Sequence, residues 1–241
     1  MPLVFSPLSD EVIALPPRSL FPRHGFLMRQ IGEAPQIDTD MAEAVSGLLE
    51  ARGYGLKDAD ASTGSKDYLE RILGLIRGTG LTIAVFSHQT RPTALANIML
   101  ELGFAAMCGK PLMIVKSKDA PAPSDLKRTD WIDYDFADPV NFERKVGQAL
   151  DEIEALAEFE EQLLDLALDA PSMDCAVAFE RAHRAFLLAG QPEMLEKAES
   201  IRDRIAGVRN IETVADLNRL HDEIAMFVKQ GRRCRLPRVA D

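Results

Sequence analysis

Short apolar runs alternate with helix-periodic segments through the first part of the chain. The clearest strand is predicted at residues 81–87, an unbroken apolar run typical of strands that a parallel sheet buries on both faces. Similar runs predict strands at residues 24–31 and 112–116, a weak strand at 53–60 and a short edge strand at 131–134. The sheet is therefore expected to contain several strands joined by intervening segments.

Between these runs, apolar residues recur at helical spacing. Helices are expected from Asp38, which we interpret as an N-cap, to Gly53, and then over residues 65–77 and 93–108. Strands that alternate with helices form parallel sheets with right-handed crossovers. The fold class predicted for this region is α/β, a doubly wound parallel sheet.

The pattern changes from about residue 140 onward, where long helical periods dominate. Breaks at residues 169–171, 190–192 and 207–210 divide this part into about four helices. We expect three units, listed by residue: an irregular N-terminal arm with five prolines over 1–22, the α/β domain over 23–152, and a C-terminal all-helical unit over 153–241.

Composition narrows the class of protein. Hydrophobic residues at 46% and charged residues at 27% are ordinary for a globular chain, and a net charge of −10 argues against a direct nucleic-acid binder. Three cysteines do not suggest a disulfide framework, and no apolar run approaches the roughly 18 residues of a membrane span. Without a recognisable signal peptide, we expect a cytoplasmic protein that does not enter a membrane.

One carboxylate, Glu101, stands out within residues 90–111. This segment predicts a helix that is apolar on all sides and therefore buried, and a buried Glu requires either a partner or a function. Asn97 lies one turn earlier on the same face and is placed to hold it. The pair is either a structural brace between loops or an active carboxylate, whose raised pKa would suit it to stabilise an oxocarbenium-like centre.

Several polar residues follow predicted strands, where α/β sheets bind ligands near the switch point in strand order. These candidates are Arg29, Gln30, Asp58, Asp60, Ser87 and His88. His88 also fits an ordinary loop histidine. His183 and His221 have no Cys or acidic partner at metal spacing, so no metal site is expected.

The motif Asn97-x-x-x-Glu101-x-Gly103, followed by Gly-Lys-Pro at 109–111, resembles one known group of proteins. Over residues 24–150 the chain is similar to the nucleoside 2-deoxyribosyltransferase-like and Toll/interleukin-1 receptor-like (TIR-like) domains of bacteria. That resemblance implies a flavodoxin-like fold and cleavage of N-glycosidic bonds in nucleosides or in NAD.

By this resemblance Glu101 matches the glutamate that attacks or stabilises C1′ of the ribose, and Asn97 the polar residue one turn before it. Asp58 and Asp60 match groups that bind ribose hydroxyls. The first strand, with Met28, Arg29 and Gln30, would contribute to the pocket for base and ribose, all read from the sequence.

The chain departs from deoxyribosyltransferases in the loop at residues 87–94, which lacks their Ser-x-Gly-Thr pattern. We therefore expect hydrolysis of NAD to nicotinamide and an ADP-ribose product, with NAD as substrate and no prosthetic group. The resemblance further implies a bacterial defence effector activated by assembly, so the C-terminal helices would form a homo-oligomer or bind another protein. Two alternatives stay open: a non-catalytic nucleotide-binding sensor or scaffold, and a nucleoside deoxyribosyltransferase or hydrolase.

Overall fold

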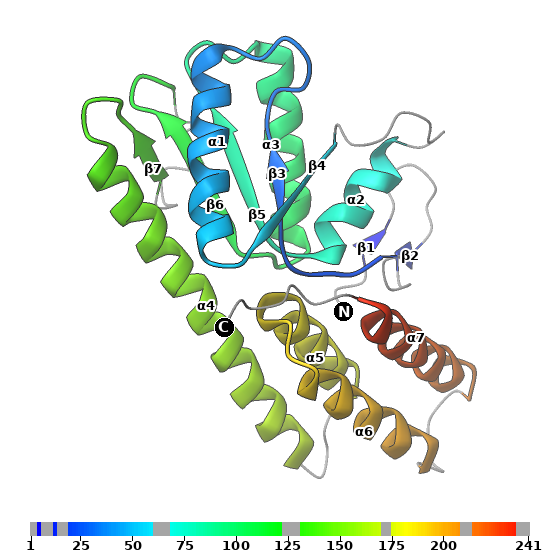
Figure 1. The fold of residues 1–241 in the computed structure, drawn as a ribbon. Helices are drawn as coiled ribbons and strands as arrows, with labels where there is room; N and C mark the ends of the chain where they lie inside the picture. Colours follow the sequence, from blue (N-terminus) through cyan, green and yellow to red (C-terminus); the bar gives the residue numbers. More distant parts are fainter. Residues whose placement is uncertain are drawn as a thin grey trace.

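A five-stranded parallel sheet forms the centre of the first domain, with strand order β4-β3-β5-β6-β7 (Figure 1). The computed structural model describes residues 4–5, 12–13, 19–59, 68–121, 131–169, 175–207 and 214–234. The strands are β3 (Phe21–Met28), β4 (Gly55–Asp58), β5 (Thr79–Phe86), β6 (Leu112–Ser117) and β7 (Trp131–Tyr134). The expected doubly wound α/β fold is confirmed.

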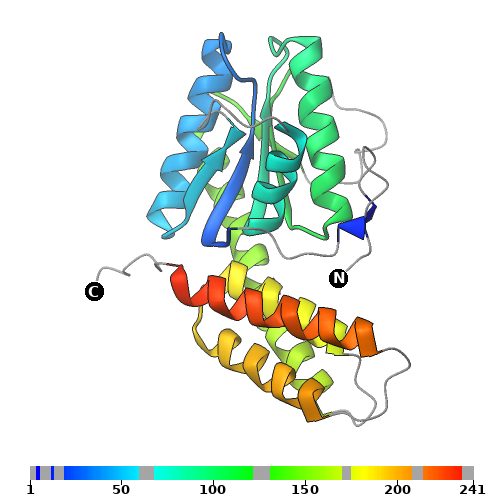
Figure 2. The ribbon, with the colours of Figure 1, turned by 90° about the vertical axis from the view of Figure 1, so that its right-hand side faces the viewer.

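Helices cover both faces of this sheet (Figures 1 and 2). On one face lie α1 (Gln36–Ala51) and the first half of α4 (Pro139–Asp169), which share a core with Val85 and Val115. On the other lie α2 (Tyr68–Gly78) and α3 (Pro92–Met107), which share a second core with Phe26 and Phe86. Every residue of β5 is buried, which explains its unbroken apolar run.

The C-terminal helices form a third core beside the amino ends of the strands (Figure 2). They are the second half of α4, α5 (Cys175–Ala189), α6 (Glu193–Gly207) and α7 (Val214–Arg233). The boundary expected near residue 152 falls inside α4, a continuous helix of 31 residues. Phe142 and Val146 pack on the sheet while Leu164 packs in the helical unit, so one helix joins the two units.

Two details of the predicted elements are wrong. Asp38 is not the N-cap of α1; it lies in the first turn, and Pro35 occupies the cap position. The helix around Glu101 is not buried on all sides, because Leu100 and Met107 are 52% and 60% exposed.

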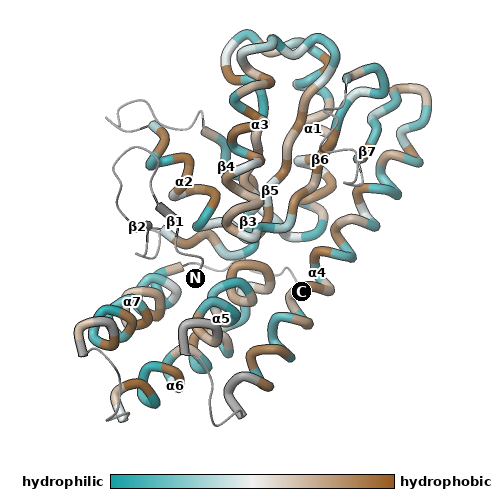
Figure 3. The backbone as a smooth tube through the Cα atoms, turned by 180° about the vertical axis from the view of Figure 1, so that it is seen from behind, coloured by the Kyte–Doolittle hydropathy of each residue, from teal (hydrophilic) through white to brown (hydrophobic). Residues whose placement is uncertain are grey.

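In Figure 3 the hydrophobic colouring runs through the sheet, whereas loops and outer helix faces carry most of the hydrophilic residues.

The segment expected to be an irregular arm contains regular structure at both ends. β3 begins at Phe21, and β1 (Val4–Phe5) pairs in antiparallel orientation with β2 (Val12–Ile13).

Among the described helices, none has both the length and the apolar character that crossing a membrane requires.

Candidate functional site

The strand order places the topological switch point between β3 and β5, whose following loops diverge toward opposite faces of the sheet. Most residues that the sequence nominated lie at this edge. Met28 differs from these polar residues, because its apolar side chain is buried in the core under α2 and α3. Asp60 lies outside the described residues.

Arg29 and Asp58 bind each other. The Nη2 atom of Arg29 lies 3.0 Å from Oδ2 of Asp58, so an ion pair joins the ends of β3 and β4. Both side chains remain partly exposed. A ligand hydroxyl that approached Asp58 would therefore meet a carboxylate whose position is already fixed by a cation.

Gln30 bridges the loops on the two sides of the switch point. It is only 2% exposed, its Nε2 donates to the carbonyl of Glu33 at 2.6 Å, and its Oε1 accepts from the backbone N–H of Arg91 at 2.9 Å. The guanidinium of Arg91 also donates to the carbonyl of Ile31 at 3.4 Å. The Gln30 amide thus orients the start of α3.

Ser87, Thr90 and Asp38 form a buried chain of hydrogen bonds that the sequence did not reveal. The backbone N–H of Ser87 donates to Oγ1 of Thr90 at 2.7 Å, and the Thr90 hydroxyl donates to Oδ2 of Asp38 at 2.7 Å. Asp38 is 1% exposed, and its Oδ1 has no partner among the described residues. These contacts tie α1 to the loop after β5.

His88 lies next to Ser117 and connects the ends of β5 and β6. Its backbone N–H donates to Oγ of Ser117 at 3.2 Å, and its Nδ1 lies 3.3 Å from the same oxygen. Its Nε2 lies 3.3 Å from the side-chain nitrogen of Gln89. As a whole residue, His88 is exposed at the carboxyl edge of the sheet.

Glu101 occupies the buried face of α3 together with Ile98, Leu102 and Ala105. It is 9% exposed, and no hydrogen bond or ion pair joins it to another residue in the described parts of the chain. Burial raises the pKa of its carboxyl group from 4.5 to about 7. Near neutral pH, this side chain is therefore present in both protonation states.

The expected pairing of Asn97 with Glu101 is absent. Asn97 is exposed, and no hydrogen bond connects the two side chains within the described ranges. Side chains on a helix lean toward its N-terminus, so Glu101 leans toward the end of α3 that follows β5, although it lies in the second half of this helix. Among the residues that the structure describes, no hydrogen bond or ion pair joins Glu101 to the residues nominated at the carboxyl edge.

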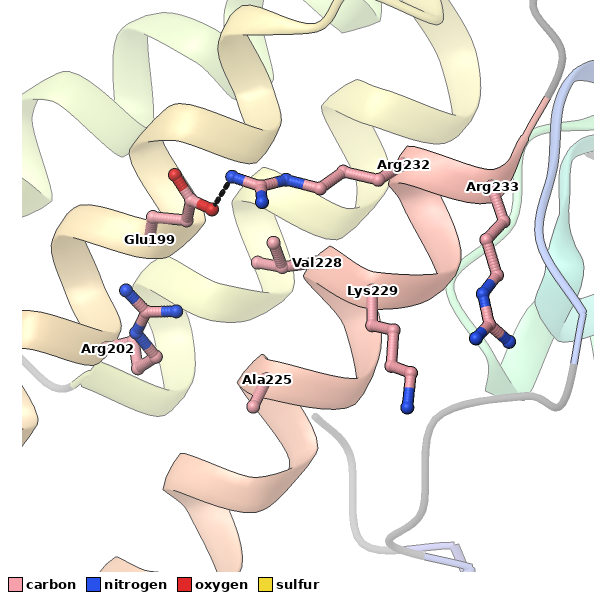
Figure 4. Close-up of a pocket in the computed structure, with 7 residues that line it drawn as sticks. All are labelled: Glu199, Arg202, Ala225, Val228, Lys229, Arg232 and Arg233. Carbon is pink, nitrogen blue, oxygen red and sulfur yellow. Dashed lines mark hydrogen bonds and ion pairs between the residues drawn. The ribbon is translucent and has the colours of Figure 1, made fainter.

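Two hollows lie far from this edge. One, of about 340 Å³, lies between α6 and α7 (Figure 4) and is lined by Glu199, Arg202, Ala225, Val228, Lys229, Arg232 and Arg233. Arg232 forms an ion pair with Glu199, while Lys229 and Arg233 point away from that pair (Figure 4). The second hollow lies at the amino end of the sheet.

Taken together, the described residues of the carboxyl edge offer polar groups from the ends of four strands, β3, β4, β5 and β6. The carboxylate with a near-neutral pKa, Glu101, lies on the buried face of α3. In the described parts of the chain, no three His, Cys, Asp or Glu side chains gather closely enough to hold a metal ion. A scan against protein-family models and a search of curated proteins gave no match to this sequence.

Proposed function

We propose that the chain cleaves an N-glycosidic bond, with NAD as substrate and Glu101 as the catalytic residue. The observation that carries this proposal is a single carboxylate, buried on α3 without a described partner, whose pKa lies near neutrality. An unpaired buried carboxylate is costly to stability. A carboxylate with a strongly perturbed pKa is a candidate for a functional role.

In this mechanism the ionised Glu101 carboxylate faces C1′ of the ribose attached to nicotinamide. The bond between C1′ and the pyridinium nitrogen breaks, and its electron pair neutralises the nicotinamide ring. The negative carboxylate stabilises the oxocarbenium-like centre that remains. Its electrostatic attraction to that positive centre is strong because burial shields the carboxylate from water. Water then adds to C1′, and its proton leaves to solvent or to Glu101.

The edge residues supply binding rather than chemistry in this proposal. Asp58 accepts a ribose hydroxyl while Arg29 holds it in place. His88 and Ser117 contribute polar contacts from the neighbouring strands. By the sequence resemblance, the protein would act as a bacterial defence effector that assembles through its C-terminal helices.

A second candidate is a non-catalytic module that binds a nucleotide at the same edge. The observation in its favour is that Gln30 closes the switch point, because its amide already bonds both Glu33 and Arg91. A ligand that entered between the loops after β3 and β5 would have to displace these bonds. A nucleotide resting on the outer rim would not.

Incubation of the protein with NAD, followed by chromatographic quantification of nicotinamide, tests the leading proposal. We expect release by the wild type and a loss of about 100-fold or more in Glu101→Gln, because the amide cannot stabilise positive charge at C1′. Glu223→Gln, which changes another buried carboxylate with a raised pKa, is the matched control. Undiminished release by Glu101→Gln contradicts the assignment.

Parallel titration distinguishes the second candidate. Saturable NAD binding without nicotinamide release, at protein concentrations high enough to force assembly, supports the non-catalytic module. Release of a free base from a nucleoside, with no activity on NAD, transfers the role of Glu101 to a nucleoside hydrolase or transferase.

A further inference from the structure

The hollow at the amino end of the sheet lies at the junction of the α/β domain and the helical unit. It has a volume of about 360 Å³, and its walls come from the starts of β5 and β6, from α4 and from α5. Gly109 and Lys110 line it from the sheet side, and Leu156, Glu160 and Arg184 line it from the helices. None of these residues belongs to the carboxyl edge.

Two glycines let the helical unit approach the sheet here. A Cβ atom on Gly80 would lie 2.5 Å from the carbonyl oxygen of Leu187, and one on Gly109 would lie 2.5 Å from Nη2 of Arg184. Gly109 also adopts a φ of +64°, a conformation that disfavours other residues. The close contacts bring charged side chains of both units to one space.

The charges around this space do not balance. Glu160 is buried and lies 2.6 Å from Nη1 of Arg181 and 3.7 Å from Nη1 of Arg184. Glu180 lies 2.6 Å from Nη2 of Arg184. Among the residues that line the hollow, two are cationic, Lys110 and Arg184, and one is a carboxylate, Glu160, within a chain whose formal net charge is −10.

Lys110 adds a positive charge to this space when its amine is protonated. Its Nζ donates to the carbonyl oxygens of Arg77 at 3.0 Å and of Thr79 at 2.6 Å, and no described carboxylate forms an ion pair with it. An ammonium group has three N–H donors, so one remains available to a ligand. Burial, together with the charges of Arg184 and Arg77, lowers the pKa of Lys110 to about 7.

We propose that this hollow binds a small organic anion, a phosphate monoester or a carboxylate, whose charged group meets Lys110 and Arg184 and whose apolar part packs on Leu156 and Leu187. Its size suits a molecule of a few hundred Å³ that is apolar on one side, as ligand pockets commonly require. A bound anion would contact both units and stabilise their docking. This inference does not depend on the proposed reaction at Glu101.

Isothermal titration with phenyl phosphate, benzoate and the neutral benzyl alcohol tests the proposal. We expect the wild type to bind at least one anion, at concentrations up to about 10 mM, and to unfold at a higher temperature when that anion is present. Which anion binds more tightly distinguishes a phosphate ligand from a carboxylate ligand. Absence of binding by both anions, or equal binding of benzyl alcohol, overturns the proposal.

Two variants locate the binding. Leu156→Trp fills the hollow without removing a charge, and Lys110→Met removes the ammonium; each should weaken the anion's affinity about tenfold or more. Leu166→Trp, at an exposed site on the same helix, and Lys118→Met, at an exposed lysine near the opposite edge, are the matched controls. Wild-type affinity in a folded Leu156→Trp protein overturns the location, even if Lys110→Met fails to fold.

Discussion

The hydroxyl of Thr90 donates a 2.7 Å hydrogen bond to the buried carboxylate of Asp38, and thereby joins the loop after β5 to the first turn of α1. The same hydroxyl accepts the backbone N–H of Ser87. One threonine therefore supports both the loop that leads to α3 and the helix across the switch point. Neither residue was expected to hold this position.

Replacing Thr90 with Val keeps the shape of the side chain and removes both hydrogen bonds. Because Oδ2 of the buried Asp38 would then have no donor among the described residues, we expect a loss of about 1–3 kcal/mol in the free energy of unfolding. Urea titration measures the change. Thr93→Val, at an exposed site in the first turn of α3, should stay within about 0.5 kcal/mol of the wild type. Equal stability of the two variants would show that the Asp38 contact contributes little.

The sequence predicted the sheet because its central strands are buried on both faces. In β5 and β6, apolar residues are required at consecutive positions, and that pattern is visible locally. The contact between Asp38 and Thr90 spans 52 positions and leaves no local signal. The sequence therefore predicts the commoner role for an Asp near a helix start, an N-cap.

The environment of Glu101 was predicted only in part. Its burial followed from the apolar neighbours, and the structure places it on the buried face of α3. The hydrogen bond expected from Asn97 does not form within the described ranges, although residues four apart lie on adjoining turns of a helix. Asn97 lies on the exposed face of α3 and Glu101 on the buried face. Which residues of α3 are buried depends on how the helix is rotated about its axis against the sheet.

The pKa of Glu101 makes stability depend on pH in a defined direction. Burial raises this pKa from 4.5 to about 7, so between these values the folded state holds a proton that the unfolded state has released. The stability contributed by the protonated carboxyl is complete below about pH 4.5 and is lost as the pH rises to about 7. The loss is on the order of 3 kcal/mol.

Glu101→Gln should remove this dependence, because the amide resembles the protonated acid and does not ionise. We expect it to match the wild type near about pH 4 and to be more stable at about pH 8 in denaturant titrations. Glu43→Gln, at an exposed position of α1, should leave the wild-type profile unchanged. A parallel pH profile for Glu101→Gln and the wild type would mean that Glu101 is not desolvated.

Gly80 and Gly74 should respond to Ala in opposite directions. At Gly80 the new methyl group would lie 2.5 Å from a backbone carbonyl oxygen of α5, so docking of the helical unit should weaken by about 1–3 kcal/mol. At Gly74, inside α2, nothing lies within 4 Å, and Ala should stabilise by about 0.5–1 kcal/mol. Thermal unfolding of both variants measures the effect. A stable Gly80→Ala protein would show that the two units pack less closely.

Apolar residues of α3 lie both on its buried face and on its exposed face. Leu100 is 52% exposed and Leu102 is 3% exposed, although the two look alike in the sequence. Leu100→Lys should therefore change the free energy of unfolding by less than about 0.5 kcal/mol. Leu102→Lys should cost more than about 3 kcal/mol, because it buries an unpaired charge beside Ile98. Urea titration of the two variants tests whether Leu100 lies on an exposed face of α3 and Leu102 on a buried one. Comparable destabilisation by both would mean that another part of the protein, or a partner, covers Leu100.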